Sequence, residues 1–172
     1  LLLMGDLLEA TRRAEVLLRE ALERGDRLSE VNVKIGFSGL LWLARDDAAG
    51  GQRAAGEAMS RWSHAGFQIQ HCFDQYAAAQ ADLYLDNAQG AYRRLLTTWP
   101  MLEESQLLRV QHIRVFLHQS RANACIALAA TQRGDKDGKH LLAQATRDVR
   151  ALLKEGAPWA DAIARAIQAG LA

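Results

Sequence analysis

Polar side chains form two stripes, each along one predicted helix. Their residue types and helical spacing suit the recognition of another molecule. The first stripe is formed by Gln68, His71, Gln75 and Asp82. The second stripe is formed by Gln111, Arg114, His118 and Arg121. At roughly 100° per residue on a helix, the first set lies within about 60° and the second within about 80°. Amide, imidazole and guanidinium groups on one helix face can bind an extended peptide or another helix.

The stripes allow two interpretations. If the helices stack as repeats, the stripes lie side by side and form a concave groove for a protein or peptide segment. Alternatively, Arg121, Asp82 and the glutamines bond to one another between helices, or the face is only hydrated. The two interpretations differ in whether these side chains have partners within the chain.

Three short segments resemble catalytic or ion-binding motifs but lack an essential feature. Residues 134–140, GDKDGKH, are one residue short of a phosphate-binding loop, lack its Ser or Thr, and follow a helix instead of a strand. Residues 135–138, DKDG, begin like a calcium loop, but no glutamate follows at the position of the bidentate ligand. Residues 36–39, GFSG, miss the nucleophile-elbow pattern by one residue and are expected within a helix. We therefore expect no catalytic residue, no enzymatic activity and no cofactor in this segment.

Metal binding is not expected either. His112 and His118 are separated by about 120° on a helix, and neither has a carboxylate or a cysteine at i+4. Cys72 and Cys125 form no CxxC motif, so they predict buried free thiols in a reducing cytoplasm.

The charge composition argues against nucleic acid and membrane as partners. The chain has 21 Lys and Arg residues and 20 Asp and Glu residues, a formal net charge of +1, and the two signs are interleaved. No apolar run reaches the ~18 residues of a membrane span, and the first residues lack the basic start of a signal peptide.

The apolar spacing predicts about eight helices and almost no strand. The helices are expected at residues 6–24, 28–44, up to about 65, 68–85, 87–99, 105–133, 140–155 and 158–169. Pro100 is expected to end the fifth helix, because proline lacks an amide donor. Pro158 is expected to begin the last one, because proline is favoured at the first helical position.

An acidic turn recurs along the chain and predicts helical repeats. Residues 45–48, RDDA, are echoed by residues 85–88, LDNA, and more loosely by residues 134–137. We therefore predict an all-α, tetratricopeptide-like α-solenoid of antiparallel helix pairs forming a single domain. Its expected parts are residues 1–27 (the second half of a truncated repeat), 28–67, 68–104, 105–157 and a capping helix at 158–172.

The chain resembles the tetratricopeptide-like C-terminal region of large multidomain bacterial serine/threonine protein kinases, which carry an ATPase module between kinase and repeats. The residues that carry this resemblance lie in five segments across the chain: 62–71, 82–85, 107–111, 158–160 and 169–172. None of them is catalytic, and the kinase motifs are absent from this sequence. The resemblance thus implies a helical-repeat fold and a regulatory role, and it transfers no kinase chemistry to any residue here.

We therefore expect a non-catalytic, cytoplasmic module that binds a protein or peptide segment, with other domains of its parent chain among the candidate partners. Leucines at the start, including Leu7 and Leu8, also predict a homodimer through the first helix. The alternative is the inducer-sensing helical-repeat arm of an ATP-dependent transcription activator. That alternative requires an enclosed and largely apolar pocket.

Overall fold

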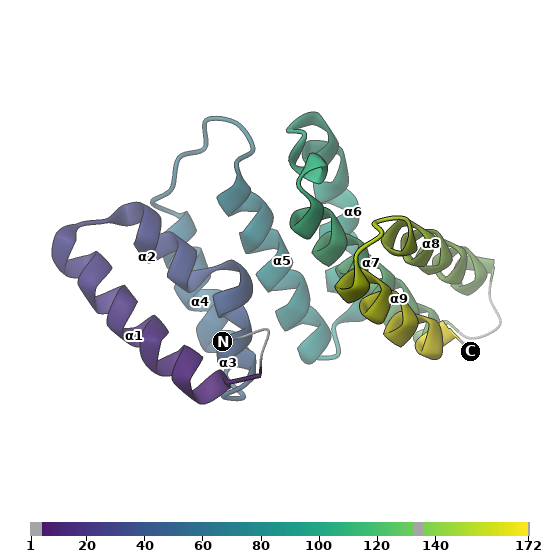
Figure 1. Ribbon diagram of the computed structural model, residues 1–172, viewed down its shortest axis with the longest axis horizontal. Coiled ribbons are helices and arrows are strands. Elements are labelled where there is room, and N and C mark those ends of the chain that lie inside the picture. Colours follow the sequence, from purple (N-terminus) through teal and green to yellow (C-terminus); the bar gives the residue numbers. More distant parts are fainter. Residues whose placement is uncertain (1–4, 133–135, 172) are drawn as a thin grey trace. The chain divides into compact units, whose positions relative to one another are not determined.

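The computed structural model describes residues 5–132 and 136–171, and within these residues every regular element is helical (Figure 1). The all-α prediction is confirmed for this part of the chain. The α-helices are α1 (Leu7–Arg24), α2 (Arg27–Lys34), α3 (Gly39–Leu43), α4 (Ala48–Met59), α5 (Ile69–Tyr84), α6 (Ala88–Glu104), α7 (Gln111–Thr131), α8 (Lys136–Leu153) and α9 (Pro158–Leu171). Short 3₁₀ turns lie at Gly36–Ser38 and Leu107–Arg109. No helix of the described part is long and apolar enough to cross a membrane.

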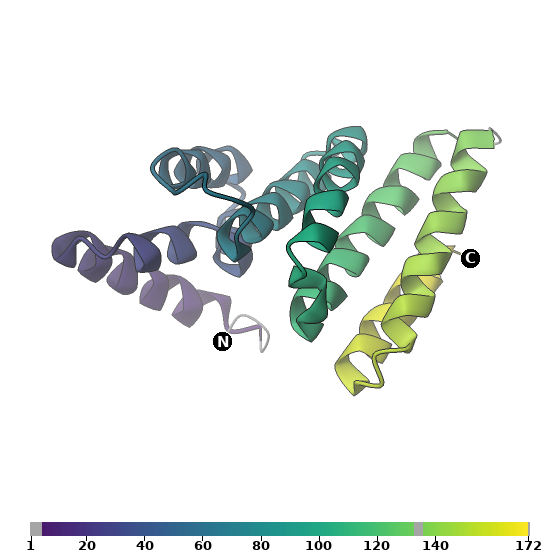
Figure 2. The same cartoon turned by 90° about the horizontal axis from the view of Figure 1, so that it is seen from above.

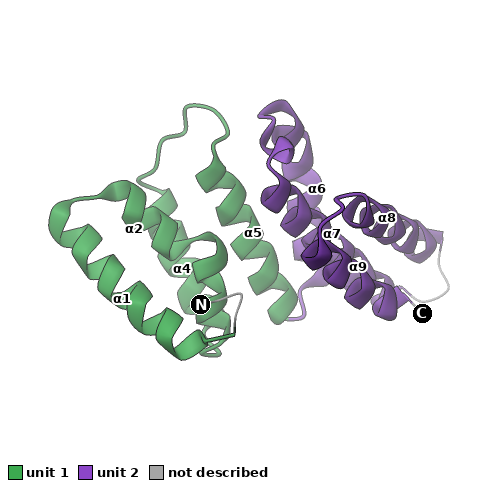
Figure 3. Ribbon diagram, in the orientation of Figure 1, with its two compact units in different colours: residues 1–85 green, residues 86–172 purple. Residues whose placement is uncertain are grey.

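The chain divides into two compact units, Leu1–Leu85 and Asp86–Ala172 (Figure 3). Unit 1 contains α1 to α5, and unit 2 contains α6 to α9. The boundary falls inside the repeat predicted at residues 68–104. The single continuous solenoid remains a prediction.

Helix α1 begins and ends where its local chemistry requires. The Asp6 side chain accepts a hydrogen bond from the Glu9 amide and caps the first turn. At the other end, Gly25 adopts a left-handed conformation with φ of 66°, and its amide donates to carbonyls of the last turn. The predicted bounds of this helix are confirmed to within one residue.

The turns after α3 and α5 share a rare backbone conformation. Asp46 and Asp86, 40 residues apart, both have a φ of 58°, which places a non-glycine residue in the left-handed region. Aspartate tolerates this region better than most residues, because its short polar side chain can bond locally. The hydroxyl of Tyr84 donates to the Asp46 carboxylate at 2.7 Å.

The next residue of each turn caps the following helix. Asp47 accepts from the Gly50 amide at 2.8 Å, and Asn87 accepts from the Gly90 amide at 3.0 Å. A Cβ atom at Gly50 or Gly90 would lie 2.1 Å or 2.2 Å from the capping side chain, so this cap favours glycine at both positions. The turn repeat predicted from the sequence is therefore present in the structure. Of the looser third turn, residues 134 and 135 lie outside the described residues.

The prediction of a single helix over residues 28–44 is wrong. Helix α2 ends at Lys34, Ile35 is extended with φ of −116° and ψ of 178°, and Gly36 has a positive φ of 65°. Ile35 is buried, and a Cβ at Gly36 would lie 3.1 Å from the Phe73 side chain of α5. The chain breaks here because the packing against α5 requires this bend. The apolar periodicity continues across the break, so the sequence pattern does not reveal it.

The prediction that Pro100 ends a helix is also wrong, because α6 continues to Glu104. A proline inside a helix removes the hydrogen bond to the carbonyl four residues earlier, here that of Leu96. Leu96 and Pro100 are exposed, so water can solvate that carbonyl. Leu102 beyond the proline is fully buried, and its burial favours continuation of the helix.

Other helix bounds differ from the prediction. Helix α4 ends at Met59, α7 starts at Gln111 after a 3₁₀ turn, and α8 begins at Lys136. Helix α9 begins at Pro158, which confirms the predicted role of this proline.

Each unit has its own apolar core. In unit 1, Val31, Ile35, Ala55 and Ala58 are buried together beneath Trp62 and Phe73. In unit 2, α7 packs against α6, α8 and α9, and Figures 1 and 2 show α7 and α8 side by side. The buried members of the unit 2 core are Ala88, Val115, Ala122, Cys125, Leu128, Ala129, Leu141, Ala145, Val149, Leu152, Ala160, Ala164 and Ile167.

Candidate functional site

The predicted polar stripe of α7 faces the end of α8 in unit 2. Arg114 donates to the Glu155 carboxylate through Nε and Nη2, the latter at 2.6 Å, and to the Leu108 carbonyl at 2.6 Å. Gln111 donates to the Glu155 carbonyl at 3.3 Å. Glu155 is mostly buried, and the hydrogen bond from Arg114 holds the pKa of its carboxyl below the ordinary value. The first half of the stripe thus joins α7 to the turn that follows α8.

The second half of the stripe converges on Asp148 of α8. His118 Nδ1 lies 2.6 Å from Asp148 Oδ1, and Arg121 reaches both carboxylate oxygens, at 2.6 Å through Nη2 and 3.0 Å through Nε. Gln144 donates to the same carboxylate at 3.2 Å. Burial opposes ionisation of Asp148, but hydrogen bonds from His118 and Arg121 outweigh it and lower the pKa.

Trp99 of α6 covers this ionic cluster. The Arg121 guanidinium carbon lies 3.2 Å from the centroid of the Trp99 ring, a cation–π contact. The His118 ring meets the same indole edge-on at 5.2 Å between centroids. The indole nitrogen of Trp99 donates to Glu103 at 3.0 Å. A ligand at His118 or Arg121 would therefore have to displace contacts that hold three helices of unit 2 together.

The sequence positions of the charged residues on α7 and after it indicate which of them can pair. From Arg114 to Arg121 the chain advances seven residues along α7, and from Glu155 to Asp148 it moves back by the same number. This opposite progression is what two antiparallel helices require. Complementary charges at matching intervals therefore indicate which side chains can pair, whereas the packing of α7 on α8 decides that they do.

The predicted stripe of α5 lies in unit 1, and its first turn forms a cap. The side-chain oxygen of Gln68 accepts a hydrogen bond from the indole nitrogen of Trp62 at 2.8 Å. The backbone amide of Gln68 donates to His71 Nδ1 at 3.0 Å. Gln75 is half-buried and donates to Asp74 at 3.1 Å. Since α5 and α7 belong to different units, the common groove remains a prediction.

The two cysteines are buried, and potential metal ligands do not cluster in the described part of the chain. Cys72 and Cys125 are free and buried, and burial raises the pKa of each thiol to about 12, so neither forms a thiolate at neutral pH. Among the described residues, no three His, Cys, Asp or Glu side chains come together as metal ligands.

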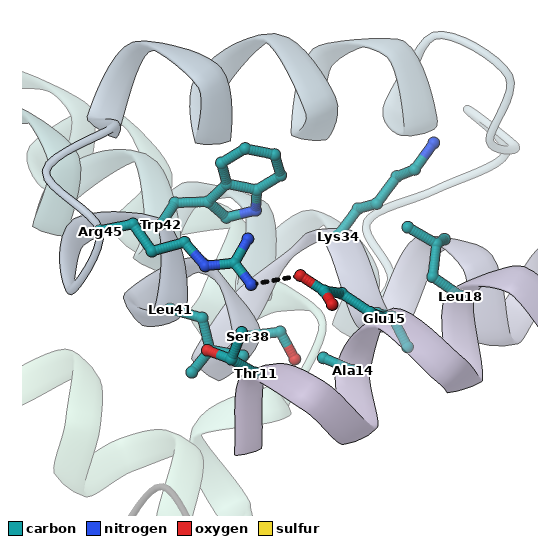
Figure 4. A pocket seen from close by; sticks show the side chains of 10 residues that line it. Thr11, Ala14, Glu15, Leu18, Lys34, Ser38, Leu41, Trp42 and Arg45 are labelled. Atoms are coloured by element: carbon teal, nitrogen blue, oxygen red, sulfur yellow. Dashed lines mark hydrogen bonds and ion pairs between the residues drawn. The ribbon is translucent and has the colours of Figure 1, made fainter. Parts of the chain in front are cut away.

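A small cleft in unit 1 lies between α1 and the segment from α2 to α3 (Figure 4). Its volume is about 60 Å³. Its apolar wall is formed by Ala14, Leu18, Val33 and Leu41. Its polar residues are Thr11, Glu15, Lys34, Ser38 and Arg45, together with the indole of Trp42. Figure 4 shows the Glu15–Arg45 ion pair reaching across the cleft.

Helix α1, which borders this cleft, exposes several leucines. Leu8 is 84% exposed and Leu22 is 53% exposed, although α1 carries an ordered helix cap at each end. Leu7 and Leu17 are exposed as well. The sequence pattern indicates the leucines of this helix but does not predict the cleft, because the lining residues of the cleft come together only when α1 packs on α2 and α3.

No family model, curated protein or solved structure matches the chain. The kinase-associated repeat region therefore remains a resemblance carried by the residues given above.

Proposed function

We propose that this chain is a non-catalytic protein-interaction module built from helical repeats. In this proposal it is the regulatory part of a larger bacterial signalling protein of the serine/threonine kinase class, in the cytoplasm. The recurring turn at Asp46 and Asp86 supports the repeat architecture. The observation that carries the interaction function is the exposure of Leu8 and Leu22 on one face of α1, because large apolar side chains exposed on the same helix face can be buried by a partner.

The partner that this surface fits is a second copy of the chain. Leu8, Glu15 and Leu22 are spaced seven residues apart and therefore share one face of α1. In an antiparallel two-fold pair, Leu8 of each copy lies opposite Leu22 of the other copy, and the two Glu15 side chains meet at the axis. Each Glu15 carboxylate already has a counter-charge in Arg45 of its own chain, so the axis does not bring two bare charges together.

Sedimentation equilibrium at micromolar to submillimolar concentration tests this function. We expect the parent chain to dimerise and Leu8→Glu with Leu22→Glu to weaken association at least about tenfold, since two charges then face the partner. Leu142→Glu is the matched control, because Leu142 is an exposed leucine of α8 in unit 2. A monomeric parent chain, or a dimer that the α1 variant does not weaken, would contradict the proposal.

The inducer-sensing alternative fits the cleft of unit 1 less well. Sites for drug-sized ligands measure roughly 300 to 1,000 Å³ and are mostly enclosed. The cleft beside α1 measures about 60 Å³ and is partly open. Its size therefore favours the interaction function over binding of a large inducer.

A further inference from the structure

The cleft of unit 1 contains hydrogen-bond donors that lack acceptors. Among the described residues, none bonds to the hydroxyls of Thr11 and Ser38 or to the indole nitrogen of Trp42. Figure 4 shows these side chains around the same space as the Arg45 guanidinium. The acidic side chain in the lining, Glu15, is paired with Arg45. A molecule that complements this cleft must therefore supply an acceptor.

The charges around the cleft favour an anion as that acceptor. Lys34 of the lining bonds to Glu30 at 3.0 Å, and Glu30 is also paired with Arg27 and Arg61. The lining of the cleft itself carries two cations, Lys34 and Arg45, and one carboxylate, that of Glu15. The local surplus of positive charge attracts a negatively charged group.

The remaining wall of the cleft is apolar and short. Ala14, Leu18, Val33 and Leu41 offer aliphatic surface next to the cationic mouth. We propose that this cleft binds a short aliphatic carboxylate, with its hydrocarbon part against this wall and its carboxylate on the Arg45 guanidinium. Planar carboxylates suit guanidinium groups because two parallel N–H donors match the two oxygens. This site goes beyond the protein-interaction function and does not depend on it.

Glu15 is the internal competitor of this ligand. The ion pair is exposed, with 43% of the Arg45 side chain and 64% of the Glu15 side chain accessible, and such pairs contribute little stability. An incoming carboxylate can therefore take the place of Glu15 on Arg45 at small cost. Removal of the Glu15 charge must then strengthen binding, whereas removal of the Arg45 charge must weaken it.

Two-dimensional NMR of the full chain tests the proposal with sodium isobutyrate at constant ionic strength. We expect a saturable shift of the Trp42 indole signal, which Trp42→Phe assigns, and no saturable shift with the isosteric neutral isobutyramide. Equal shifts with the amide would show that the charge is not recognised. The absence of any saturable shift with isobutyrate would overturn the proposal.

Three variants at Glu15 and Arg45 test the role of each charge in binding. Glu15→Gln should lower the dissociation constant about threefold or more, and Arg45→Met should abolish saturation, with Arg45→Lys intermediate. Arg13→Met is the control, because Arg13 is another exposed arginine paired with a glutamate, Glu9 of α1. Weaker binding by Glu15→Gln, or unchanged binding by both Arg45 variants, would overturn the proposal. The dimerisation test is run without isobutyrate and uses variants at Leu8 and Leu22, so its failure is distinguishable from failure of the ligand site.

Discussion

Asp148 is a buried carboxylate that the fold keeps ionised. Its side chain is 1% exposed and accepts hydrogen bonds from His118, Arg121 and Gln144. A buried charge without such partners would be costly, so each donor here offsets part of the desolvation penalty. The arginine is in turn covered by Trp99, which keeps the ion pair away from water.

We expect Asp148→Asn to lower the free energy of unfolding by about 2 to 3 kcal/mol, because the change leaves the Arg121 charge uncompensated. Urea denaturation at neutral pH measures this loss. Glu20→Gln is the control, since the Glu20–Arg24 pair is exposed and such pairs contribute at most about 1 kcal/mol. A loss no larger than that of the control would show that Asp148 does not hold unit 2 together.

The difference in unfolding free energy between the parent chain and Asp148→Asn has a defined pH dependence. The folded-state pKa of Asp148 lies below its ordinary value of 3.8. The ionised carboxylate therefore stabilises the fold above that value, and the stabilisation is lost as the pH falls through the folded-state pKa. The difference between the parent chain and Asp148→Asn should accordingly shrink below about pH 4. A difference that grows on acidification would contradict the sign of this pKa shift.

At the scale of helices and turns, two matched caps define the recurring unit. Asp47 and Asn87 each cap the helix that follows a left-handed aspartate. Asp47→Ala and Asn87→Ala should each cost about 1 kcal/mol, because each leaves an amide of the first turn without its side-chain acceptor. Thermal and urea unfolding measure both losses. Gln52→Ala on the exposed side of α4 is the control and should change stability by less than about 0.5 kcal/mol.

Most helices could be predicted from local chemistry, whereas several of their ends could not. Capping residues and apolar spacing predict α1, α5 and α9 closely, because those signals lie within the helix and its flanks. The bend at Gly36 depends on Phe73 of another helix, and the continuation past Pro100 depends on burial of Leu102. Phe73 lies in another helix, and the burial of Leu102 depends on the packing of α6 against α7.

At the scale of the whole molecule, the two units have separate cores. We expect residues 86–172, expressed alone, to fold into a helical protein that unfolds cooperatively in urea, because the core of unit 2 is formed by α6 to α9. Circular dichroism with urea titration measures both properties. A fragment without a cooperative transition would show that this core requires unit 1.

The sequence by itself determined the all-helical class, the repeated turn and the residues that share one face of α5 and of α7. These properties depend on neighbours within about one or two turns of helix, so spacing and residue type are sufficient. Only the tertiary structure decided that Arg114, His118 and Arg121 bond to Glu155 and Asp148, and that a cleft opens beside α1. Partners of this kind come from helices distant along the chain, and their contacts depend on how the apolar faces pack.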